Sequence, residues 1–294
     1  MITDIEAATP ALCRLQLGSE LRQLRMAAGI KGATVCKKLI WSPSKLTRLE
    51  TGENAAVETT DVMGLCEIYG ADPETRARLL GYAAVTKTRK DWWATPEYRP
   101  VIGPGFRAYL DLEATATSVQ TYQSEFVPGL LQTEGYVHAI YQWAGRGLPD
   151  ADAERMAAVR ATRRQVLRRP DSPLKFTVII NEAVLRRRVG SVQVMRDQLT
   201  HIVDAAESSP NVRVQVVPFS AGAHPGMDGS FVLLQFPEFL ALKPMVYLEN
   251  RVDAVVKRSD SDVERYQDVF SDLRAFASGP QESLSMIKEA IKEH

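Results

Sequence analysis

Apolar residues recur at intervals of three and four through the first ninety positions, which is the spacing of amphipathic helices. Segments with this spacing occupy 17–30, 31–40, 58–70 and 72–87, and a further segment begins after Ser42 and stops at Gly52. Gly29 marks the end of the first segment, and Asp72 with Pro73 marks the start of the last. The pattern predicts an N-terminal all-α domain of five short helices.

The segment WSPSKLTRLETG, residues 41–52, separates its side chains into two faces when wound as a helix. Ser42 is a good N-cap and Pro43 suits the first helical position. Leu46 and Leu49 lie on one side, and the other side carries short polar groups and long cations: Ser44, Lys45, Thr47, Arg48 and Thr51. Such a face suits a helix that enters a DNA groove. A solvated surface helix is the alternative that this segment leaves open.

The second and third segments are separated by a tight turn, which is the arrangement of a helix-turn-helix. Over residues 15–70 the chain resembles the Xre/Cro family of phage-repressor-like (lambda-repressor-like) DNA-binding domains, and WSPSKLTRLETG is similar to the recognition helix of that family. The chain departs from the family pattern in two places, the start of the second helix and the turn. Lys31 and Gly32 replace the usual Ser or Thr followed by Gln, and Ile40 replaces the glycine of the turn. A β-branched residue with positive φ is strained, so either the turn is built differently or the domain gives up stability.

We therefore predict that double-stranded operator DNA is contacted by Ser44, Lys45, Thr47 and Arg48 of the recognition helix, with Lys31 and Lys37 on phosphates. The formal net charge of the chain is zero, but residues 11–90 carry an excess of five basic residues. Because one domain with so modest an excess offers few contacts, we expect a homodimer on a roughly palindromic site.

Composition limits the other classes. A chain of 294 residues with 45% hydrophobic residues has room for two folded domains. We expect no membrane span, no signal peptide, no cofactor and no metal, and hence a cytoplasmic, nucleoid-associated protein. Cys13, Cys36 and Cys66 form no C-x-x-C pair, so buried free thiols are expected.

The second half of the chain alternates helical and strand patterns. Helices are predicted at 106–116, 133–144, 150–167, 191–208, 259–277 and 281–293, and strands at 118–126, 174–180, 212–219, 230–236, 245–250 and 253–258. This order predicts a mixed α/β or α+β domain. We assign 11–88 to the DNA-binding domain, 89–108 to a connector docked through its aromatic residues, and 109–294 to a C-terminal regulatory and dimerisation domain.

Two stretches of this second domain are distinctive: TYQSEFVPGLLQTEGYV at 121–137 and VQVVPFSAGAHPGMDGSFVLLQFPE at 214–238, followed by VYLEN. Most of 92–292 resembles the C-terminal domain of a group of actinomycete helix-turn-helix regulators, a domain regarded as antitoxin-like. The resemblance implies a transcriptional regulator, with a small protein partner encoded nearby.

An enzyme or small-molecule-binding domain fused to a DNA-binding module is the alternative. The chain has no G-x-S-x-G, P-loop or G-x-G-x-x-G pattern, so we expect no enzyme. The site candidate for that alternative is His224, in a glycine-rich loop that could hold a ligand or serve as a rigid connector. Arg186 and Arg187 are candidate partner contacts. The arginines of 150–169 are expected on a solvated face, or else on DNA or an acidic partner.

Overall fold

The computed structural model describes residues 9–53, 56–98, 100–143, 149–240, 242–250 and 254–294. The chain forms two compact units: residues 1–95 with 236–242, here called the helical unit, and residues 96–235 with 243–294, called the sheet unit. Within the described ranges, no helix has both the length and the apolar character that crossing a membrane requires.

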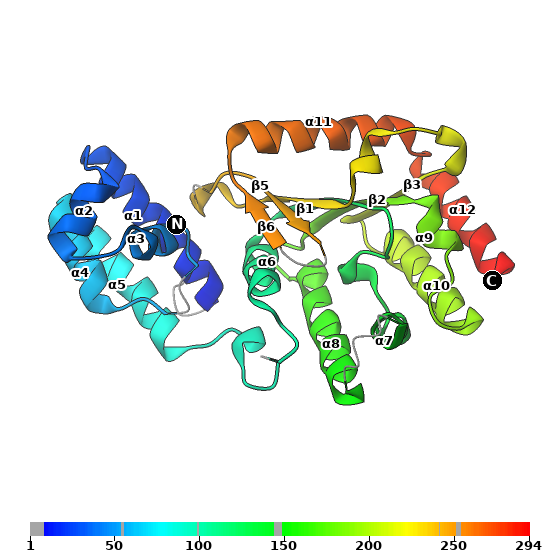
Figure 1. Cartoon of the computed structure of the whole chain (residues 1–294), viewed down its shortest axis with the longest axis horizontal. Helices are drawn as coiled ribbons and strands as arrows, with labels where there is room; N and C mark the ends of the chain where they lie inside the picture. The colour runs from blue at the N-terminus through cyan, green and yellow to red at the C-terminus, as the bar shows by residue number, and fades with distance from the viewer. Residues whose placement is uncertain (1–8, 54–55, 99, 144–148, 241, 251–253) are drawn as a thin grey trace. The chain divides into compact units, whose positions relative to one another are not determined.

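In its described part, the helical unit consists of five α-helices, as predicted (Figure 1). They are α1 (Pro10–Ala27), α2 (Gly32–Leu39), α3 (Pro43–Glu50), α4 (Thr59–Tyr69) and α5 (Pro73–Thr88). Their apolar faces meet in one core, which includes Leu17, Leu21, Leu46, Leu49 and Leu65. The three cysteines are buried free thiols, as expected, and burial raises the pKa of Cys13 to about 11.

The ends of two helices differ from the prediction. Helix α1 begins at Pro10 rather than at residue 17, because Thr9 caps the Leu12 amide at 3.2 Å. The Ala11 amide donates to the distant Asp91 carboxylate at 3.2 Å, a contact that periodicity cannot reveal. Helix α4 begins at Thr59, one residue after the predicted segment starts, and its N-cap residue Glu58 makes no side-chain cap bond.

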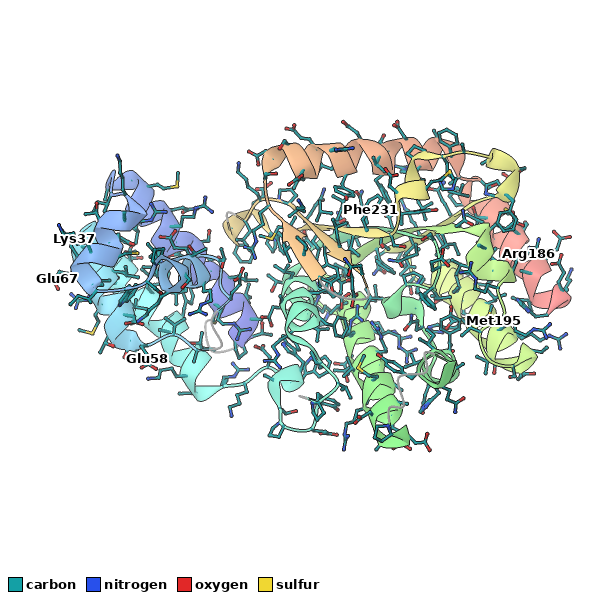
Figure 2. All side chains as sticks on the ribbon, viewed as in Figure 1. Lys37, Glu58, Glu67, Arg186, Met195 and Phe231 are labelled. Carbon is teal, nitrogen blue, oxygen red and sulfur yellow. The ribbon has the colours of Figure 1, made fainter. Side chains whose placement is uncertain are left out.

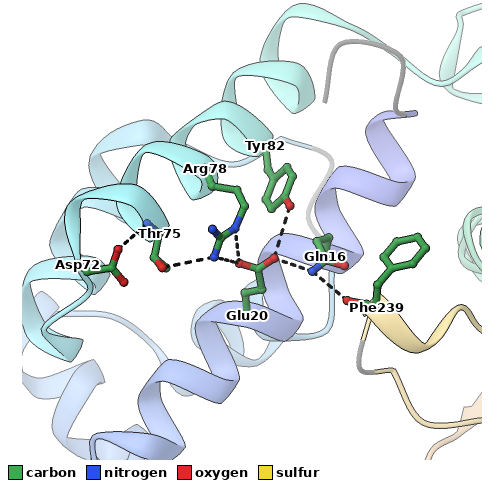
Figure 3. A network of polar contacts seen from close by, with 7 residues as sticks. All are labelled: Gln16, Glu20, Asp72, Thr75, Arg78, Tyr82 and Phe239. Carbon is green, nitrogen blue, oxygen red and sulfur yellow. Dashed lines mark hydrogen bonds and ion pairs between the residues drawn. The ribbon is translucent and has the colours of Figure 1, made fainter. Parts of the chain in front are cut away.

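A polar network ties α1 to α5 inside the helical unit (Figure 3). Glu20 accepts from both Nε and Nη2 of Arg78 at 3.1 Å and from Tyr82 Oη at 3.4 Å. Gln16 Nε2 donates to Glu20 at 2.5 Å and to the Phe239 carbonyl at 3.3 Å. Residues 236–242, distant in sequence, therefore belong to the same network as α1.

The turn between α2 and α3 has the left-handed backbone that its family resemblance implied. Ile40 has φ 55° and ψ 45°, and it is the one non-glycine with positive φ among the described residues. Its side chain is 94% exposed, so packing offsets none of the strain. A left-handed conformation costs an L-residue about 1–2 kcal/mol. Of the two possibilities, the second holds: the turn is built normally and the domain gives up stability.

Replacing Ile40 with glycine is expected to raise the free energy of unfolding of the helical unit by about 0.5–1 kcal/mol. The gain is smaller than the strain removed, because glycine loses more backbone entropy on folding. Urea unfolding followed by circular dichroism measures the change. Ile40→Val is the control and should leave stability unchanged, since valine is also β-branched. A lower stability of Ile40→Gly would contradict this account.

The described residues of the sheet unit form a six-stranded sheet in the order β3-β2-β1-β4-β5-β6. The strands are β1 (Ser118–Gln123), β2 (Lys175–Asn181), β3 (Val212–Val217), β4 (Phe231–Gln235), β5 (Met245–Glu249) and β6 (Ala254–Lys257). β1, β2 and β3 run parallel, and the other pairings are antiparallel. The expected strands are thus confirmed, and residue 253 of the last one lies outside the described residues.

Helices cover both faces of this sheet (Figure 1). α11 (Asp260–Phe276) lies on one face; α6 (Pro104–Thr115), α7 (Glu134–Trp143), α8 (Asp150–Arg163) and α10 (Val192–Ser208) lie on the other. Short α9 (Glu182–Arg186), which was not predicted, follows β2, and α12 (Pro280–Glu293) packs on α10 and β3.

Residue 144, expected in a helix, lies outside the described residues. Phe231 is buried in the core beneath α11, and Met195 of α10 is buried on the opposite face of the sheet (Figure 2). The unit is α+β, as expected.

Candidate nucleic-acid interface

The local sequence of α3 determines where the helix begins. Ser42 Oγ accepts from the Lys45 amide at 3.3 Å, and Pro43 occupies the first turn, so the predicted cap is confirmed. Leu46 and Leu49 are buried in the core of the helical unit. Gly52, with φ 73°, allows the chain to turn away after Glu50. The opposite face of α3 is thereby left outward.

Two contacts fix α3 against α1. Arg25 forms a two-pronged ion pair with Glu50, with Nε to Oε1 at 2.6 Å and Nη2 to Oε2 at 2.9 Å. This hydrogen bonding raises the pKa of Arg25. At Gly18 the helices approach so closely that a Cβ there would lie 2.5 Å from the Leu49 carbonyl oxygen. Sequence reasoning missed this pair, because α1 and α3 are only brought together by the fold.

The outward face of α3 presents Ser44, Thr47 and Arg48, all exposed. Thr47 Oγ1 donates to the Pro43 carbonyl at 3.0 Å, and the Ser44 hydroxyl lies 3.0 Å from that of Ser42. Both oxygens retain lone pairs that can accept hydrogen bonds. Arg48 makes no ion pair or hydrogen bond through its side chain within the described part of the chain. Its guanidinium is therefore available to a base edge or a phosphate.

Lys45 differs from the other predicted contacts. Its Nζ pairs with Asp61 of α4 at 2.8 Å and lies 4.0 Å from the centroid of the Trp41 ring. A DNA contact by Lys45 would have to replace this ion pair. The structure thus brings Lys45 together with α4, and it leaves Arg48 as the available cation of the α3 face.

Lys31 and Lys37 belong to α2 and its N-cap. Both are exposed, and Lys37 projects outward from α2 (Figure 2). Lys31 is the N-cap residue but makes no side-chain cap bond. Both predicted phosphate contacts are therefore exposed side chains of α2 and its N-cap.

The loop that contains His224 is held by its own contacts. His224 Nδ1 accepts from the Gly226 amide at 3.1 Å, and Nε2 lies 3.3 Å from Asn181 Nδ2. Gly226 is so close to Tyr122 that a Cβ would lie 2.5 Å from the tyrosine ring. Burial lowers the pKa of His224. The ring therefore organises a turn between β3 and β4, as a rigid connector requires.

Arg186 and Arg187 are ion-paired rather than free. Arg186 Nε pairs with Glu182 at 3.1 Å and its Nη1 pairs with Glu293; Arg187 pairs with Glu125. Arg186, Arg188, Glu293 and His294 line a pocket of about 320 Å³. A partner at Arg186 or Arg187 would have to compete with these carboxylates.

Two arginines of α8 depart from the expectation of a solvated face. Arg163 is 4% exposed, and its Nε and Nη2 donate to the two oxygens of Glu113, both at 2.7 Å. Arg160 stacks beside Phe106 in the same cluster, with its guanidinium carbon 5.1 Å from the ring centroid. Arg163 is therefore not a surface cation, whereas Arg160 is partly exposed. Glu113 sits inside a predicted helix, and an acid among apolar neighbours was the signal available in the sequence.

Comparison with known proteins gives two family matches. Residues 106–289 match the model of a domain of unknown function, DUF5753, and residues 16–79 match a helix-turn-helix domain. No curated protein and no solved structure matches the chain. The helix-turn-helix match spans most of α1–α5 and indicates a DNA-binding regulator.

Proposed function

The chain belongs to the DUF5753 family and carries a helix-turn-helix domain, and on that basis we propose that it is a sequence-specific, Xre-type transcriptional regulator. The observation that carries this proposal is the face of α3. Ser44, Thr47 and Arg48 are exposed on the same helix. The Ser42 cap and two buried leucines fix the position of that helix. Side chains of these types reach base edges in the major groove.

Titration of the full-length protein with DNA tests the proposal. The fragment upstream of its own gene should bind more tightly than a scrambled fragment of equal length at fixed salt. Specific binding usually exceeds non-specific binding by about 10³-fold or more. Equal affinity for the two fragments, together with no sequence enriched when the protein selects from a pool of random DNA, would reject sequence-specific recognition.

The sheet unit supplies dimerisation and sensing in this proposal. The sheet unit has a hydrophobic core of its own, and in the proposal two copies of it hold two DNA-binding units about 34 Å apart, one helical turn. Both ring nitrogens of His224 lie in contacts within its own loop and with Asn181, which supports a structural role for this ring over a catalytic one. An antitoxin-like role with a small protein partner remains part of the proposal and follows from the family resemblance.

Light scattering on the full chain is expected to give twice the 32.6 kDa chain mass at micromolar concentration. The full chain is required because the helical unit includes residues 236–242. Variants that weaken DNA binding through α3 should keep this mass. A monomer in solution that also binds its DNA with a one-to-one stoichiometry would contradict the dimer.

A further inference from the structure

Two arginines of α8 lie side by side in the sheet unit. The Nη1 atoms of Arg160 and Arg163 are 2.6 and 2.8 Å from the same point, the place that a Cβ on Gly129 would occupy. Both guanidinium carbons also lie close to the Phe106 ring, at 5.1 and 5.2 Å from its centroid. Two like charges have thus been brought together in a largely desolvated place.

One buried carboxylate serves this pair. Glu113, 1% exposed, takes both hydrogen bonds from Arg163 and a third from Tyr109 Oη at 2.6 Å. The other carboxylate that acts on Arg160, Glu249, is exposed and forms no ion pair with it within the described residues. Among the described residues, therefore, no buried acid neutralises the second positive charge of the cluster.

Some donors of this cluster have no acceptor. Arg163 Nη1 and Arg160 Nε are buried and lack a hydrogen-bond partner in the described structure. Burial and the charge of Arg163 lower the pKa of Arg160. Buried polar groups without partners are rare in folded proteins, and an absent ion is one physical reason for them.

The surroundings define a ligand chemistry. Arg160 is only partly buried, as are Phe106 and Tyr141, which pack beside Met156 and Ala157. The cluster therefore reaches the surface at Arg160. Guanidinium groups match the planar fork of carboxylates and the oxygens of phosphates, and the two rings offer apolar surface next to them.

We propose that Arg160, with Nη1 of Arg163, binds the oxyanion group of a small molecule, a phosphate or a carboxylate, whose apolar part packs on Phe106 and Tyr141. The anion neutralises the excess charge and supplies the missing acceptors. This site deepens the sensing role proposed for the sheet unit and rests on it, whereas its test uses no DNA, so that failure here leaves DNA recognition untouched.

Isothermal titration of the full chain with sodium phosphate and with sodium succinate, each against sodium chloride at equal ionic strength, tests the site. We expect saturable binding of at least one of the two anions, and the preferred one identifies phosphate or carboxylate. Arg160→Met should weaken it at least about tenfold. Arg155→Met is the matched control, since Arg155 lies on the same helix but pairs with Asp152, and it should bind as the wild type does.

Stability without added anion gives a second readout. Arg160→Met should unfold at a higher temperature than the wild type, because it removes an uncompensated charge while keeping most of the apolar stem. A lower unfolding temperature would show that Arg160 is purely structural and would overturn the proposal. Binding of neither anion, or equal binding by wild type and Arg160→Met, would also overturn it.

Discussion

Replacing Glu113 with alanine is expected to lower the free energy of unfolding of the sheet unit by about 3–5 kcal/mol, the effect of breaking a buried ion pair from one side. Glu113 is the only buried carboxylate described beside Arg160 and Arg163, and it accepts three hydrogen bonds. Its loss leaves Arg163 charged and unpaired, 4% exposed. Urea unfolding of the full chain, followed by circular dichroism, measures the change.

Glu125→Ala is the matched control. Glu125 also pairs with an arginine, Arg187, but the two side chains are 58% and 47% exposed. Surface pairs contribute about 1 kcal/mol or less, so this variant should lie close to the wild type. Similar losses in the two variants would show that the burial of Glu113 does not govern the effect.

Replacing Arg48 with alanine is expected to weaken binding of the cognate DNA by about 1–3 kcal/mol if its guanidinium reads a base. Arg48 is the exposed cation of the α3 face, and Lys45 is held by Asp61. Because a base contact acts on the cognate site alone, scrambled DNA should lose less affinity. Fluorescence anisotropy with both DNAs at fixed salt measures the difference.

Lys37→Ala separates phosphate contacts from base reading. Lys37 is exposed on α2, where a point charge can reach the backbone. Lys37→Ala should lower the affinity for cognate and scrambled DNA by the same factor. It should also reduce the slope of log affinity against log salt concentration by about one. If Arg48→Ala changed neither DNA while Lys37→Ala changed both, α3 would not be the reading helix.

Local chemistry made much of the helical unit predictable. The cap at Ser42, the proline after it and the leucine spacing of α3 are properties of neighbouring residues, and the structure confirms them. The family pattern left the geometry of the inter-helix turn open, because Ile40 replaces its glycine, and the structure shows Ile40 in the left-handed conformation. The first seven residues of α1 were missed although Thr9 and Pro10 form a local start signal; only their further support from Asp91, some eighty residues away, cannot be found from neighbouring residues.

Long-range pairing set the limit for the candidate sites. The sequence predicts that Lys45 is a free cation. Its ion pair with Asp61 becomes visible only once α4 is placed beside α3. The sequence predicts that the arginines at the end of α8 are solvated. Arg163 is buried because its ion pair is with Glu113 of α6, a contact between two helices that only the fold shows. Strand patterns likewise predicted the six strands but not that β4 would pair with β1.

The helical unit is discontinuous along the chain, because residues 236–242 belong to it and one of their carbonyls, at Phe239, accepts from Gln16. A chimaera joined at a single boundary near residue 95 would separate Gln16 from the segment that accepts its hydrogen bond. Gln16 is 2% exposed, so the new neighbour would inherit a buried amide short of an acceptor. A chimaera that exchanges the DNA-binding part should therefore carry residues 236–242 along with residues 1–95.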